Sequence, residues 1–357
     1  MTKAVRTQTK AMAGNFFEDF SLGQVIVHAT PRTATQGDAS LYTALYGSRF
    51  ALNSSDEFAR RNGYERSPLD DLLVFHIVFG KTVPDISLNA VANLGYADCR
   101  FLSPVFAGDT LSARSEVIGL KKSRGSNTGV VYVRSTGINQ RGEEVLDYVR
   151  WVLVRARAED APAQPDHVPE LPGEVAALRL AVPAGVDFSD FDIDASGSPH
   201  LWDDYAVGER IDHVDGVTIE EADHMLAARL YQNTARVHFN QFSESQGRFG
   251  RRIIYGGHIM SLARALSFNG FANACHVAAI NGGRHVAPTF AGDTVFAWST
   301  VLDKAELDGR ADLGALRLRT IAAKDQPCRD FPEKTGEKAY HEAVVLDLDY
   351  WVLMPRR

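Results

Sequence analysis

The chain has 357 residues, of which 45% are hydrophobic and 23% charged, and this composition is that of a folded globular protein with one large or two medium cores. Its 38 Lys and Arg against 45 Asp and Glu give a net charge of −7, and the longest basic cluster is the group Lys121, Lys122 and Arg124, so no nucleic-acid partner is expected. The longest apolar stretch, 72–80, is far shorter than the roughly 20 residues of a membrane span, and three cysteines without metal-ligand spacing argue against a disulfide framework or a zinc site.

In chain order, a polar and basic N-terminal segment comes first, and it lacks the apolar core of a secretory signal. We therefore expect a cytoplasmic protein. Residues 15–156 form the first predicted unit. Thr33 and Gln36 have the spacing of a capping box, which predicts that a helix begins there. A second helix is predicted at about 69–81, and because it is apolar nearly all round we expect it to be deeply buried.

Residues 157–199 form a predicted linker. They hold six of the 14 prolines of the chain together with scattered acidic residues. Such a composition is typical of a connecting segment between two folded units.

Residues 200–357 form a second predicted unit that repeats the first. Phe16 to Gly23 match Leu201 to Gly208 at a separation of 185 positions, and the capping-box pair Thr33 and Gln36 recurs as Thr218 and Glu221. An Ala-Gly-Asp-Thr turn occurs at 107–110 and again at 291–294. Its Gly108 and Gly292 fit turn positions that tolerate a positive φ.

Both units have the same order of elements, a capped helix, an apolar helix and then several strands. The second apolar helix, at 256–270, carries an amphipathic stripe, and residues 346–352 alternate as in an antiparallel strand. A helix wrapped by a curved antiparallel sheet, present twice, is an α+β architecture whose two sheets can join edge to edge. We therefore predict a double hot-dog fold.

Reactive residues that occur in only one unit are candidates for function. His238, which can move a proton near pH 7, is replaced by Asn53 in the first unit. Asn233 is likewise replaced by Ser48, and Arg236 by Ala51. Only the second unit can perform acid–base chemistry at this place, so the first is predicted to be non-catalytic.

The segment from Arg251 to His258 opens the second apolar helix. Gly256 and Gly257 allow a close approach of the backbone, and unpaired N–H groups at a helix N-terminus can stabilise an oxygen that gains negative charge. The alternative is a simple loop-to-helix joint. His258 falls close to the register of His76, which favours a packing role for both.

The second unit resembles the MaoC-like, or hydratase 2, enoyl-CoA hydratases, whose motif is Gly-Asp-x-Asn-Pro-x-His. The five-residue spacing is kept as Asn233 to His238, with Asn in place of Asp and Ala235-Arg236 in place of Asn-Pro. Longer stretches, from about Asn15 to Arg356, resemble the mesaconyl-CoA hydratase (β-methylmalyl-CoA dehydratase) family. They include residues 74–85, 231–235, 255–258, 266–270 and 315–319.

This resemblance implies reversible dehydration of β-methylmalyl-CoA to mesaconyl-CoA, in a route such as the ethylmalonyl-CoA pathway or the 3-hydroxypropionate cycle. It implies no metal and no cofactor, since coenzyme A is part of the substrate. We assign His238 to deprotonate the water and Asn233 to orient it. Either His238 serves as both base and acid, or a carboxylate such as Glu244 assists.

The second carboxylate of that substrate requires a cation, preferably a guanidinium. Arg236 is the first candidate and Arg252 the second, with Tyr255, Gly256 and Gly257 also assigned to substrate binding. The basic group around Lys122 could hold the coenzyme A phosphates or be a solvated turn.

A homodimer is expected, since hot-dog sheets commonly pair through their edges. Two other functions stay open. One is a thioesterase, which would release free coenzyme A. The other is a non-catalytic acyl-CoA-binding module, which the replacement of Asp by Asn233 would favour.

Overall fold

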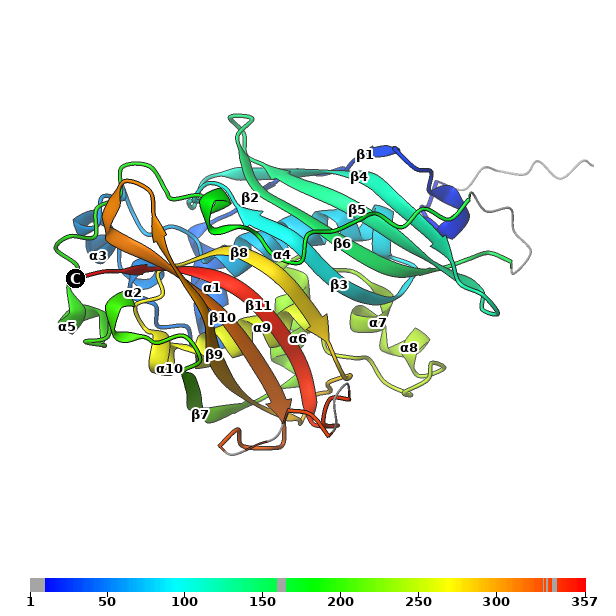
Figure 1. Ribbon diagram of the computed structural model, residues 1–357. Coiled ribbons are helices and arrows are strands. Elements are labelled where there is room, and N and C mark those ends of the chain that lie inside the picture. Colours follow the sequence, from blue (N-terminus) through cyan, green and yellow to red (C-terminus); the bar gives the residue numbers. More distant parts are fainter. Residues whose placement is uncertain (1–9, 159–164, 330, 332, 336–338) are drawn as a thin grey trace, which may run out of the picture.

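The computed structural model describes residues 10–158, 165–329, 331, 333–335 and 339–357. The N-terminal unit contains four long strands, two short strands and several short helices around one central helix, α4 (Figure 1). In chain order its elements are η1 (Phe17–Asp19), β1 (Val25–Val27), β2 (Arg32–Thr33), α1 (Gln36–Tyr46), α2 (Ala51–Ser54), α3 (Asp56–Arg61), α4 (Asp71–Thr82), η2 (Val83–Ser87), β3 (Ala90–Phe101), β4 (Thr110–Lys122), β5 (Thr128–Ile138) and β6 (Glu144–Arg155).

The C-terminal unit repeats this order around its own central helix, α9, after a connecting segment with two short helical turns. The elements are η3 (Ala177–Arg179), α5 (Ile193–Ser196), η4 (Trp202–Asp204), β7 (Arg210–Thr218), α6 (Glu221–Leu230), α7 (Arg236–Phe239), α8 (Gln241–Glu244), α9 (Gly256–Leu266), α10 (Phe268–Phe271), β8 (His276–His285), β9 (Thr294–Leu307), β10 (Arg310–Lys324) and β11 (Val344–Pro355).

The strands of both units form one continuous antiparallel sheet. Its order is β1-β4-β5-β6-β3-β8-β11-β10-β9-β7, with β2 paired to β4. The two halves join where β3 pairs with β8, for example Tyr96 opposite Gly283 and Cys99 opposite Ile280. The predicted double hot-dog, with two sheets joined edge to edge, is therefore confirmed.

The two central helices lie against this sheet, each on its own half (Figure 1). Every residue of α4 from Leu72 to Thr82 is buried, as its all-round apolar sequence predicts. The helices meet at Gly257, where an added Cβ would lie 2.5 Å from Cε1 of His76. In the described part of the chain, no helix combines the length and the hydropathy that crossing a bilayer would require.

The helix starts differ from the predicted capping boxes. The box of α1 is formed by Thr35 and Asp38, not by Thr33 and Gln36, and no side chain caps the start of α6. Thr33 and Thr218 instead lie at strand ends, where their hydroxyls hydrogen-bond those of Thr110 and Thr294 at 2.7 and 2.9 Å. The repeated threonines therefore stabilise a strand pair in each unit. The Thr-x-x-Gln/Glu spacing alone cannot distinguish this role from that of a helix cap.

The predicted helix at 256–270 also ends earlier than expected. Helix α9 stops at Leu266, and the backbone leaves helical geometry at Asn269 and at Gly270, whose φ is 115°. The reason is tertiary: the Asn269 carbonyl accepts a hydrogen bond from the His213 ring at 2.7 Å, and its side-chain amide donates to the His213 carbonyl. By contrast, Gly108 and Gly292 have the positive φ values predicted for their turns.

The segment between the units packs closely on the sheet. Val175 is fully buried, its N–H donates to Asn281 and its carbonyl accepts from the Trp351 indole. Trp351 follows Tyr350 on β11 and therefore points to the face opposite the central helices. The Pro-rich segment thus covers the outer face of the sheet near the joint between the units (Figure 1).

Candidate active site

A cavity of about 220 Å³ lies between the two units. The C-terminal unit contributes α7 and the start of α9, and the N-terminal unit contributes β3 and β6. Polar side chains at its wall come from both units: Ser87, Asn93, Tyr96, Arg150, Asn233, His238, Tyr255, His285 and Thr289.

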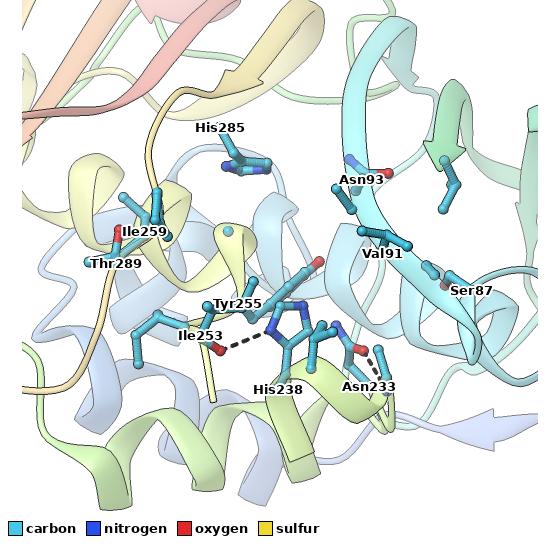
Figure 2. A pocket seen from close by; sticks show the side chains of 18 of the residues that line it. Ser87, Val91, Asn93, Asn233, His238, Ile253, Tyr255, Ile259, His285 and Thr289 are labelled. Atoms are coloured by element: carbon cyan, nitrogen blue, oxygen red, sulfur yellow. Dashed lines mark hydrogen bonds between the residues drawn. The ribbon is translucent and has the colours of Figure 1, made fainter. Parts of the chain in front are cut away.

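His238 projects from the short helix α7 into this cavity (Figure 2). Its Nδ1 lies 3.0 Å from the Ile253 carbonyl oxygen, which can only accept a hydrogen bond. We therefore assign the proton to Nδ1, which leaves the Nε2 lone pair free. Burial lowers the pKa of His238 to about 4, so the ring is neutral near pH 7 and can act as a base.

Asn233 lines the same cavity and is fully buried. Its Oδ1 accepts a hydrogen bond from the Ala235 N–H at 3.3 Å, and this contact fixes which end of the amide is the donor. The Nδ2 group is shielded from solvent and has no partner among the described residues. An unsatisfied buried donor is costly, so this N–H₂ group is a binding site for the oxygen of a water or ligand.

The N-terminus of α9 forms another part of the wall. Tyr255 and Gly256 line the cavity, and the Tyr255 ring lies edge-on to His238 at 5.5 Å between centroids. The N–H groups of Gly256 and Gly257 belong to the first turn, where an α-helix supplies no acceptor. Gly257 lies behind the wall, packed against His76.

The sequence analysis missed His285 and Tyr96, which lie across the cavity from His238 (Figure 2 labels His285). They come from the joined strands β8 and β3, and His285 Nε2 lies 3.2 Å from the Tyr96 hydroxyl. Burial lowers the pKa of His285 to about 4, with His238 as the second cause. A comparison of the two units could have identified both residues. The first unit has Phe101 where the second has His285, and the second unit has Ile280 where the first has Tyr96, so each polar side chain occurs in one unit only.

A second missed feature is a polar patch from the N-terminal unit, formed by Asn93 and Arg150. Both amide atoms of Asn93 and the Nε of Arg150 are shielded from solvent and lack partners among the described residues. Arg150 itself is fully buried. The comparison of the two units could have identified Arg150 as well, because the second unit has Tyr350 at the corresponding position.

Other predicted residues lie away from the cavity wall. Arg236 points to the N-terminal unit, where its guanidinium donates to Asn89 Oδ1 at 2.5 Å and to the Ala13 carbonyl. Arg252 pairs with Glu221, and Glu244 lies on α8 beside Ser243. Helix geometry explains why Arg236 does not reach the cavity, because it lies on the side of α7 that faces Asn89.

The remaining candidates also lie outside that wall. Lys121 and Lys122 end β4, and Arg124 follows in the turn to β5. His258 bonds the Tyr46 hydroxyl at 2.9 Å and His76 bonds Ser261 at 2.9 Å, both inside the protein. His76 thus links the central helices α4 and α9, and His258 links α9 to α1.

An imidazole with a free lone pair, a buried amide donor beside it and a helix N-terminus, all at the joint of a double hot-dog, define a hydro-lyase of the MaoC-like class. The sequence matches the family model described as mesaconyl-CoA hydratase over residues 2–337. The chain belongs to the mesaconyl-CoA hydratase family.

Individual relatives agree with this assignment. The β-methylmalyl-CoA dehydratase of Chloroflexus aurantiacus is 64% identical over 98% of this chain and 99% of its own length. The mesaconyl-CoA hydratase of Cereibacter sphaeroides is 58% identical over 97% of this chain and 100% of its own.

Two solved structures show the same fold. A MaoC domain dehydratase of Chloroflexus aurantiacus superposes with a TM-score of 0.96, at 64% identity over 98% of this chain and 100% of that one. A Mycobacterium tuberculosis protein with a double hotdog fold gives 0.75, at 25% identity over 96% and 99%.

Proposed function

We propose that this enzyme interconverts β-methylmalyl-CoA and mesaconyl-CoA by adding or removing water. The observation that carries the proposal is the pair of groups at the cavity wall, the free Nε2 of His238 and the unpartnered Nδ2 of Asn233. The names and the near full-length identity of the two relatives support the substrate.

In the hydration direction, the Asn233 amide donates a hydrogen bond to the oxygen of the attacking water. His238 Nε2 accepts a proton from that water as its oxygen bonds to the β-carbon. The electron pair of the double bond moves to the thioester, whose oxygen becomes enolate-like. Asn233, which stands where the family motif has Asp, can serve this step because its amide N–H holds the water oxygen while His238 alone takes the proton.

The developing negative charge requires stabilisation, and the N-terminus of α9 supplies it. The Gly256 N–H at the cavity wall is our candidate donor to the thioester oxygen, and one such donor typically contributes about 3–4 kcal/mol. The α-carbon then takes a proton, which His238 Nε2 can return. His285 is the other imidazole at the wall, and a His285→Ala variant separates the two possibilities.

No step of this mechanism uses a metal or a cofactor. The enzyme is proposed to act in the cytoplasm as a homodimer. The edge strands of the sheet are β1 and β7, and the edge at β1, whose Val25 and Val27 are exposed, is the proposed dimer contact. Light scattering of the purified chain gives the oligomeric state, and a monomeric mass would contradict the dimer.

The test is the ultraviolet absorbance of the conjugated enoyl thioester when the protein is added to β-methylmalyl-CoA. We expect absorbance to rise to an equilibrium, to fall from the other side with mesaconyl-CoA, and to change little with crotonyl-CoA. No change with any of the three would contradict a hydro-lyase. Release of free thiol would indicate a thioesterase instead.

A further inference from the structure

Arg150 lies on β6 and is paired across the sheet with Tyr96 of β3. Its side chain is fully buried, yet it lines the cavity that holds His238. The equivalent position in the second unit is Tyr350. The first unit, which lacks the catalytic imidazole, therefore places a buried cation at the site.

The groups that contact Arg150 in the described part of the chain are uncharged. Its Nη2 donates to the Thr82 hydroxyl at 2.8 Å, Ser87 Oγ lies 3.4 Å away, and the guanidinium stacks on the Phe79 ring at 4.1 Å. All of these groups are neutral. Among the described residues, no carboxylate lies within ion-pair distance of Arg150.

The nearest acidic residues along these strands are occupied by other arginines. Asp98 pairs with Arg134 and Arg179, and Asp147 pairs with Arg100 and Arg134. A buried cation without a partner costs several kcal/mol, because arginine stays protonated and has lost its hydration. Arg150 is therefore a buried cation with no anionic partner among the residues that the structure describes.

The part of the cavity wall next to Arg150 carries hydrogen-bond donors that can bind an anion. Within the described residues, the Asn93 Nδ2 donor and Arg150 Nε have no partner, and the Ser87 hydroxyl is close to Arg150. These donors come from the N-terminal unit, whereas His238 and Gly256 come from the C-terminal unit. Figure 2 shows Asn93 and Ser87 on one side of the cavity and His285 and Thr289 on another.

We propose that Arg150, assisted by Asn93, binds the free carboxylate of the acyl group and so sets the preference for dicarboxylic substrates. This inference rests on the proposed function. In either thioester isomer of mesaconyl-CoA the free carboxylate is bonded to a carbon of the double bond. It must therefore be buried together with the reacting carbons, where only a buried cation can neutralise it.

The test measures binding and so does not depend on turnover. Calorimetry compares the binding of methylsuccinyl-CoA and 2-methylbutyryl-CoA. The second ligand has a methyl group in place of the carboxylate, and the acyl chain of each is saturated, so neither can be hydrated. We expect the wild-type protein to prefer the dicarboxylic ligand by about 10²- to 10³-fold. In Arg150→Met this preference should disappear through weaker binding of methylsuccinyl-CoA alone.

Arg236→Met is the matched control, because it makes the same substitution at an arginine that lies away from the cavity wall, and it should keep the preference. Arg150→Lys keeps the charge but loses the bidentate fork, so a reduced preference is expected, and this variant carries the test if Arg150→Met does not fold. Equal loss of both ligands in either Arg150 variant, or a preference as large as that of the wild-type protein, would overturn the inference. Failure of the wild-type protein to hydrate mesaconyl-CoA would instead contradict the proposed function.

Discussion

At the scale of single residues, the tautomer of His238 decides what the site can do. The Ile253 carbonyl accepts from Nδ1, so Nε2 faces the cavity without a proton. The glycine at 256 has an equally specific reason. An added Cβ there would lie 2.3 Å from Cε1 of His285, so only glycine allows the helix start and this imidazole to share one wall.

His238→Ala should lower kcat by about 10²- to 10⁴-fold, because the variant lacks the group that takes the proton from water. The absorbance assay with mesaconyl-CoA measures this loss. His200→Ala removes an exposed imidazole and is the matched control. A His238→Ala enzyme with wild-type kcat would refute the assignment of the base.

At the scale of elements, a helix of one unit holds the catalytic segment of the other. An added Cβ on Gly80 of α4 would lie 1.7 Å from the Tyr231 carbonyl oxygen, and the Lys81 ammonium donates to the Gln232 side chain. Gln232 has a φ of 55°, which is strained for a residue with a side chain. Helix α4 thus stabilises the turn that leads directly to Asn233.

Gly80→Ala should therefore destabilise the protein by about 3 kcal/mol or more, because backbone atoms cannot move aside as a flexible side chain can. It should also reduce kcat by displacing Asn233. Thermal melting and the absorbance assay measure the two effects. Gly173→Ala, at an exposed position where an added Cβ meets nothing within 4 Å, should leave both unchanged. An unaltered melting temperature in Gly80→Ala would show that this contact is not tight.

At the scale of the whole molecule, burial keeps several imidazoles neutral, some of them near the joint between the units and one, His213, on the edge strand β7. Burial lowers the pKa of six histidines to about 4 or below, namely His76, His213, His224, His238, His258 and His285. These rings are neutral in the folded protein. In the unfolded chain they titrate near pH 6.5, so the unfolded state binds more protons below that pH.

Stability should consequently fall as the pH drops from 7 to 5, since each such histidine removes up to about 1.4 kcal/mol per pH unit. Asp70 acts in the opposite direction, because burial raises its pKa to about 6 and the folded protein binds its proton first. The net expectation is a loss of several kcal/mol, measured from urea midpoints at both pH values. A urea midpoint that is the same at pH 7 and pH 5 would contradict this expectation.

The sequence by itself determined the repeat, the two central helices and the candidate pair Asn233 and His238, which the structure places at one cavity. These features depend on local patterns, and the internal duplication made the unique imidazole visible without any other protein. It also predicted the edge-to-edge joint in outline. It misplaced the helix caps, because a threonine at the end of a strand has the same spacing as one that caps a helix.

Only the tertiary structure decided which charged and polar groups share the cavity. Arg150, Asn93 and His285 meet His238 because β3 pairs with β8 and β6 pairs with β3. Arg236, only two positions from His238, is turned toward Asn89 instead. The physical reason is that strand register and helix rotation set the direction of a side chain, and neither can be obtained from distance along the chain.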